Sequence, residues 1–192
     1  MKISNNKFQI TNSKGYTLIE LLIVMVVLVT VGIIVAAIIV SALRGTNKAK
    51  TEDAIRKNGN YTILQMSRMI EFAQSFQGVG TDGVNFTPIC SNPAAHYNYI
   101  KITSFDNLST TFACNYSVNP AIISSNSASF INTNEVTLTP NKCYFTCQRT
   151  NISDLPVIGI SFELTQQSPS SFFENKASQT FSTSVIMRNL NK

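Results

Sequence analysis

The sequence contains very few of the side chains from which active sites are built. His96 is its only histidine, so histidine clusters for metal binding or catalysis are excluded. No serine lies in a Gly-x-Ser-x-Gly turn, and no glycine-rich segment leads into the Lys-Ser/Thr of a phosphate-binding loop. The aspartates of the last two thirds lack calcium-loop spacing: Asp82, Asp106 and Asp154. We therefore predict that the protein is not an enzyme and uses neither a metal nor a cofactor.

Charge is absent from one long segment near the N-terminus. Residues 21–43 carry no charged side chain, and only Thr30, Gly32 and Ser41 interrupt the Leu, Ile, Val, Met and Ala residues. A helix needs about 20 apolar residues to cross a bilayer core of about 30 Å, so this segment is long enough to span one. Glu20 stands at its start. A charge costs roughly 2.5–3.5 kcal/mol at the centre of such a helix, which predicts a dedicated role and a partner for Glu20.

A short motif leads into the apolar segment. It reads Lys14-Gly15-Tyr16-Thr17-Leu18-Ile19-Glu20. The motif resembles that of the type IV pilin-like superfamily, which comprises type IV pilins and the pseudopilins of secretion and competence systems. The family pattern is a basic leader, a glycine, an apolar residue, Thr or Ser, two aliphatic residues, Glu and a long apolar helix. Tyr16 stands where phenylalanine is commoner, and the close resemblance covers only the first third of the chain.

The resemblance implies a route of processing and assembly. A membrane-embedded prepilin peptidase would cleave between Gly15 and Tyr16 and methylate the new amine of Tyr16. Glu20 would then pair with the Tyr16 amine of a neighbouring subunit, since two buried opposite charges cost less together than apart. The implied partners are other pilins or pseudopilins, the prepilin peptidase and an inner-membrane assembly platform. The head would lie outside the cytoplasmic membrane, in a periplasmic or extracellular filament.

Two other kinds of N-terminal segment share some of these features. A secretory signal peptide is cleaved after its apolar run, where Ala36-Ala37 and Ser41-Ala42 imitate its small-residue site, but this run is too long for one. The second alternative is a plain signal anchor, in which Glu20 would have no dedicated role. Basic residues flank the run on both sides, so the positive-inside rule gives no orientation. The orientation, with the leader inside and the bulk outside, rests on the resemblance.

The net positive charge of the chain comes largely from its first residues. Lys and Arg number 15 against 10 Asp and Glu, a formal net charge of +5. Without Lys2, Lys7 and Lys14 of the leader, 12 basic residues face the 10 acidic ones, a formal +2. This excess is too small to indicate a nucleic-acid-binding surface.

All four cysteines follow the apolar segment: Cys90, Cys114, Cys143 and Cys147. An even number in an exported domain predicts two disulfides, with three pairings open, and the alternatives are free thiols or a metal site. If residues 143–147 form one extended strand, Cys143 and Cys147 are about 13 Å apart and cannot bridge each other. Each would then pair with Cys90 or Cys114.

After Gly45 the sequence has the period of an amphipathic helix. One face recurs at spacings of three, four or seven residues: Ile55, Thr62, Met66, Met69, Ala73 and Phe76. We expect Asn58-Gly59-Asn60 to kink or loosen this helix. We expect Gln77-Gly78-Val79-Gly80 to end it.

The sequence after the amphipathic helix is rich in Ser, Thr and Asn, and it predicts short strands. They are expected at residues 99–105, 110–118, 129–131, 135–138, 143–149, 157–165 and 180–187. Turns are expected at Asn107, Asn119-Pro120, Pro140-Asn141 and residues 168–171, and a loop over residues 83–97. Ile158, Ile160, Phe162 and Leu164 alternate with smaller or polar residues, which is typical of a half-buried antiparallel sheet.

These patterns together predict an α+β protein of four parts. They are a leader over residues 1–15, a transmembrane or filament-core helix over 16–43, an amphipathic helix over 44–78, and an extracytoplasmic β-rich head over 79–192. The amphipathic helix would cover the apolar face of the antiparallel sheet, which is also the pilin architecture.

Two further segments narrow the resemblance. Met66-Ser67-Arg68-Met69-Ile70 and residues 181–189, which end in Arg188-Asn189, are similar to minor pilins of the W type and pseudopilins of the J type. This favours a minor over a major subunit. A pseudopilin of type II secretion or of competence remains open. The alternative from another class is a singly anchored extracytoplasmic enzyme or receptor that forms no filament.

Overall fold

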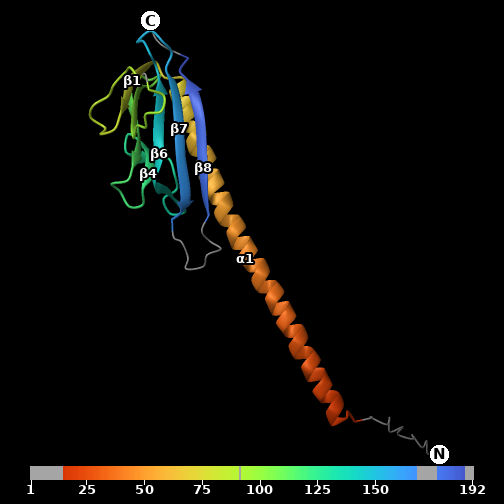
Figure 1. Ribbon diagram of the computed structural model, residues 1–192. Coiled ribbons are helices and arrows are strands. Elements are labelled where there is room, and N and C mark those ends of the chain that lie inside the picture. Colours follow the sequence, from red (N-terminus) through yellow and green to blue (C-terminus); the bar gives the residue numbers. More distant parts are fainter. Residues whose placement is uncertain (1–14, 91, 168–176, 189–192) are drawn as a thin grey trace, which may run out of the picture. The chain divides into compact units, whose positions relative to one another are not determined.

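The structure, a computed structural model, describes residues 15–90, 92–167 and 177–188 (Figure 1). Lys14 of the motif, the rest of the leader before it and the turn expected at residues 168–171 lie outside the described residues. The chain divides into two compact units, Met1–Arg44 and Gly45–Lys192. Each unit is described by itself below.

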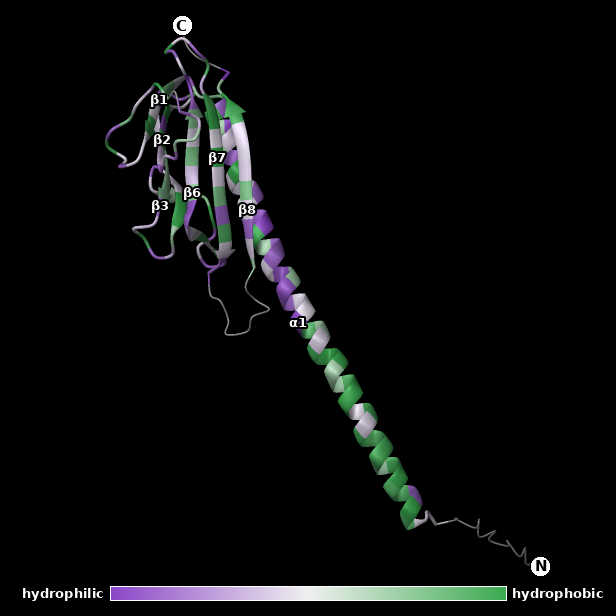
Figure 2. Ribbon diagram, in the orientation of Figure 1, coloured by the Kyte–Doolittle hydropathy of each residue, from purple (hydrophilic) through white to green (hydrophobic). Residues whose placement is uncertain are grey.

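In the first unit the described residues are almost entirely helical. Helix α1 spans Leu18–Glu71, and its residues in this unit are exposed throughout. Figure 2 shows that hydrophobic residues dominate this part of α1. The helix is long and apolar enough to cross a membrane, as the uncharged run predicts.

In the second unit α1 has one buried face. Ile55, Gly59, Thr62, Met66 and Ile70 are buried at spacings of four, three, four and four residues. This is the spacing of a helix packed along one side. Residues 58–60, where a kink or loosening is expected, lie within α1, which continues through them as helix.

Helix α1 ends earlier than the sequence pattern predicts. It stops at Glu71, and strand β1, Ser75–Gly80, contains both Phe76 and the predicted helix end. The amphipathic helix expected to reach residue 78 is therefore too long by seven residues, and Phe76 is buried from a strand. Gly78 has φ of 142° and lies at a register shift between β1 and β2. Glycine is favoured here because L side chains rarely adopt this φ and because a Cβ would lie 2.7 Å from the carbonyl oxygen of Thr87.

The head contains two antiparallel sheets, which confirms the α+β class. The first has the order β1-β2-β3-β4-β5, with β2 at Tyr99–Thr103, β3 at Ser109–Asn115, β4 at Ile122–Ser125 and β5 at Ala128–Ser129. The second has the order β6-β7-β8, with β6 at Val136–Gln148, β7 at Val157–Gln166 and β8 at Ser178–Ile186. The predicted burial of Ile158, Ile160, Phe162 and Leu164 on β7 is confirmed.

Three features of the sheets differ from the prediction. Strands β1 and β4 were not expected from the sequence. The two strands expected at 135–138 and 143–149 form the single strand β6. Pro140-Asn141 does not reverse the chain, because the pairing of β6 with β7 shifts register between Leu138 and Cys143 and then continues.

Two disulfides join the first half of the head to β6. Cys90 bonds to Cys147 and Cys114 to Cys143, with Cα–Cα distances of 5.7 and 5.8 Å. All four cysteines are buried in the apolar core. The predicted disulfides are confirmed, and both cysteines of β6 reach a partner outside their own strand.

Candidate functional site

The segment before α1 is exposed and has no regular secondary structure. Gly15, Tyr16 and Thr17 are outside any helix or strand, and Tyr16 is 83% exposed. A Cβ built on Gly15 meets no atom within 4 Å. The peptide bond between Gly15 and Tyr16 is therefore free of secondary structure, which is the form in which a peptide can be bound along its backbone.

Thr17 and Glu20 determine where α1 begins. The backbone N–H of Glu20 donates to Thr17 Oγ1 at 3.3 Å, and the N–H of Leu21 donates to the Thr17 carbonyl at 3.2 Å. Thr17 is thus the N-cap, and Glu20 occupies the third helical position, at the spacing of the Ser/Thr-x-x-Glu motif. A carboxylate in the first turn also interacts favourably with the helix dipole. The N-terminal motif includes both residues, but the sequence alone did not predict that Thr17 caps the helix.

The predicted motif residues are close together at the N-terminal end of the described chain. They form the exposed segment before α1 and its first turn: Gly15, Tyr16, Thr17, Leu18, Ile19 and Glu20. Within the described residues no ion pair involves Glu20. The four cysteines that the sequence also singled out lie in the head, where they form two disulfides within its core.

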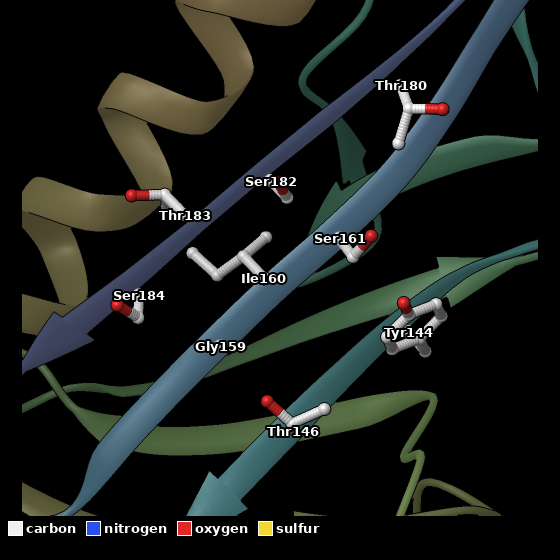
Figure 3. Close-up of a pocket in the computed structure, with 9 residues that line it drawn as sticks. All are labelled: Tyr144, Thr146, Gly159, Ile160, Ser161, Thr180, Ser182, Thr183 and Ser184. Carbon is white, nitrogen blue, oxygen red and sulfur yellow. The ribbon is translucent and has the colours of Figure 1, made fainter. Parts of the chain in front are cut away.

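The head bears a shallow hollow on the solvent side of the β6-β7-β8 sheet (Figure 3). Its volume is about 640 Å³ and its lining carries hydroxyl groups on all three strands: Tyr144, Thr146, Ser161, Thr180, Ser182 and Ser184. Gly159 forms its floor, because a side chain there would overlap Thr146 Oγ1. No carboxylate, amine or imidazole lines the hollow. Its residues therefore offer hydrogen bonds but no acid–base pair.

His96 and the scattered aspartates have local structural roles. The His96 ring stacks on Tyr144 with centroids 3.8 Å apart. Asp82 accepts hydrogen bonds from the backbone N–H groups of Val84 and Asn85 at 3.0 and 2.9 Å. These bonds, with that from the Asn85 side chain, lower the pKa of the Asp82 carboxyl. In the described ranges, no three His, Cys, Asp or Glu residues are grouped to hold a metal ion.

Arg149 is a buried cation that the sequence did not single out. Its side chain donates to the carbonyls of Asp154 at 3.0 Å, Pro88 at 3.5 Å and Ile152, and its guanidinium lies over Phe76, 5.6 Å from the ring centroid. Arg149 is only 5% exposed. Buried charges need such partners, so Arg149 ties two loops to β1 rather than presenting a free charge.

Comparisons of the chain with protein-family models, with curated proteins and with solved structures gave no match.

Proposed function

We propose that this chain is a structural subunit of a type IV pilus-like filament, and that it is a minor pilin or pseudopilin. It would be cleaved after Gly15 and N-methylated at Tyr16 by prepilin peptidase. It would then assemble with other pilins from an inner-membrane platform and display its disulfide-stapled head outside the cytoplasmic membrane.

One observation carries this proposal. An exposed Gly15–Tyr16 bond, outside any helix or strand, directly precedes a helix whose apolar residues up to Leu43 are exposed on every side. Such a helix is stable only in lipid or among other apolar helices, because in water each large apolar side chain left exposed forgoes about 1.5–3 kcal/mol. A membrane anchor that later enters a helical filament core meets this requirement at both stages.

The position of Glu20 supports the filament over a simple anchor. A carboxylate at the start of an apolar span is costly unless it is paired. After cleavage, every neighbouring subunit would carry a positive Tyr16 amine near the start of its own apolar span. This amine could pair with the Glu20 carboxylate. Pairing these groups would set the register between subunits, and loss of one partner of a buried pair costs about 3–5 kcal/mol.

The first experiment is the intact mass and N-terminal sequence of the membrane- or filament-associated protein. We expect a chain that starts at methylated Tyr16. A start at Met1 would identify an ordinary anchored protein, and a start near Ser41 a secreted one. Either result contradicts the proposal.

The second experiment tests assembly separately from processing. We expect Glu20→Gln to be cleaved normally but to be lost from sheared filaments. Glu52→Gln changes another glutamate of α1 and should assemble like wild type. Normal filament incorporation of Glu20→Gln would refute the pairing.

A further inference from the structure

Strand β8 has one open edge. It is the last strand of the β6-β7-β8 sheet and pairs only with β7. At the opposite side of this sheet, Tyr97 bridges to Phe145 of β6, and Cys90 bridges to Arg149 directly after β6. The two edges therefore differ, and only that of β8 is left without a neighbouring strand in the described part of the chain.

The direction of the backbone groups of β8 follows from its two ends. The N–H of Met187 donates toward β7, to the carbonyl of Pro156, at 3.4 Å. The N–H of Arg188 points the other way and donates to the carbonyl of Glu71 at the end of α1, at 2.9 Å. Pairing from Ser178 to Ile186 has no register shift, so this alternation continues along the strand.

Four residues of β8 consequently present both backbone groups to the open edge: Thr180, Ser182, Ser184 and Ile186. Among the described residues, no backbone hydrogen bond satisfies these groups. All four side chains are exposed, as the same alternation requires. An edge of this kind is a template for another strand.

The edge of β8 forms one side of a groove. The groove has a volume of about 630 Å³ and is lined by residues 183–188, by Leu155 and, on the side of α1, by Ser67 and Glu71. Figure 1 shows β8 beside the last turns of α1. The ion pair between Arg188 and Glu71, with Nε and Oε1 2.7 Å apart, stands at one end of the groove.

The usual protections of an edge strand are missing here. Between Ser178 and Ile186 the sequence contains no charged residue and no proline, and the strand contains no bulge. Natural proteins use lysine, proline or bulges to keep such edges from pairing. The one acidic and one basic residue of the groove neutralise each other. The groove is therefore suited to an uncharged occupant.

We propose that the groove between β8 and α1 binds an extended, uncharged peptide segment of a partner protein as a fourth strand of the sheet. Only another main chain offers alternating donors and acceptors at the spacing of a strand, about 6.7 Å for every second residue. Half-exposed Leu155 and Ile186 would contact its apolar side chains. This inference concerns the isolated subunit and does not rest on filament formation.

The test uses the full-length protein in detergent micelles and a fluorescein-labelled peptide with the sequence of residues 178–188. This peptide is uncharged along its strand, and fluorescence anisotropy reports its binding. We expect saturable binding to wild type and about tenfold weaker binding to Ser184→Pro. This proline removes one outward N–H, places its ring at the edge and leaves the bonds to β7 in place. Ser184→Ala keeps the backbone donor and should bind within about twofold of wild type.

A second measurement does not depend on how the proline variant folds. The same peptide, N-methylated at every backbone amide so that neither of its edges has donors, should lose binding to the wild-type protein. Absence of saturable binding to wild type, or equal binding of the methylated peptide, would overturn the proposal. If the peptide binds only to a variant truncated after Arg188, residues 189–192 block the groove in the full-length protein. That result would also overturn the proposal.

Discussion

Gly59 provides a sharp test of how α1 packs on the head. It is buried on α1, and the ring of Phe181 from β8 lies directly over it. A Cβ at this position would fall 2.5 Å from Phe181 Cε1 and closer still to Cε2 and Cζ. Phe181 is 6% exposed and stacks on Phe162 with centroids 5.4 Å apart. The ring therefore has little room to withdraw.

Two opposing effects determine the stability of Gly59→Ala. Replacing glycine in a helix interior gains about 0.5–1 kcal/mol. Overpacking a filled core costs about 1–3 kcal/mol. Since the clash involves three ring atoms in a buried stack, we expect the second effect to win by about 1–2 kcal/mol. For a chain of this size that lowers Tm by about 2–8 °C.

The assay is thermal unfolding of wild type and variants in one detergent, followed by near-ultraviolet circular dichroism. Gly45→Ala is the matched control, because it lies in the same helix and its new Cβ meets no atom within 4 Å. That variant should be more stable than wild type. Phe181→Leu removes the ring, so combined with Gly59→Ala it should lose less stability than the two changes sum to. If Gly59→Ala raises Tm as Gly45→Ala does, the packing described here is wrong.

Three further predictions concern the head. Replacing Cys114 and Cys143 by serine opens a bridge between residues separated by 29 positions; chain entropy predicts a loss of up to about 3.6 kcal/mol, measurable as a lower urea midpoint. Arg149→Met leaves three loop carbonyls without their donor and should cost about 2–4 kcal/mol, with faster amide exchange in both loops. Burial raises the pKa of Tyr116, whose hydroxyl oxygen accepts a bond from the N–H of Cys143 at 2.9 Å. The unfolded chain then ionises first, so stability should fall as the pH rises above about 10, and Tyr116→Phe should reduce that fall.

Local patterns were sufficient for much of the fold. The uncharged run predicts the exposed part of α1, and the alternation on β7 predicts which of its side chains are buried. The spacing of Cys143 and Cys147 excludes a bond between them once both lie on one strand. Each of these inferences depends only on residues near in sequence, where the periods of helix and strand apply.

Other features depended on contacts between distant residues. The end of α1 was misplaced because Phe76 continues the helical spacing, whereas pairing with β2 draws residues 75–80 into a strand. Gly59 was expected to loosen α1, but it provides the space for Phe181, 122 residues later in the chain. The open edge of β8 is set by strand order. Such order is non-local and cannot be obtained from the period of a single strand.

The capping arrangement of Thr17 gives a physical reason for the spacing of the N-terminal motif. By starting α1 at Leu18, Thr17 keeps the Gly15–Tyr16 bond outside the helix, which the proposed cleavage requires. Cleavage there would place a new positive charge beside the helix N-terminus, where the dipole disfavours it. Glu20, in the first turn, is a carboxylate that would offset this positive charge and also interacts favourably with the helix dipole. In the proposed filament a neighbour's Glu20 can serve the same amine, so one residue would act first as a helix-start residue and then as the contact that sets register between subunits.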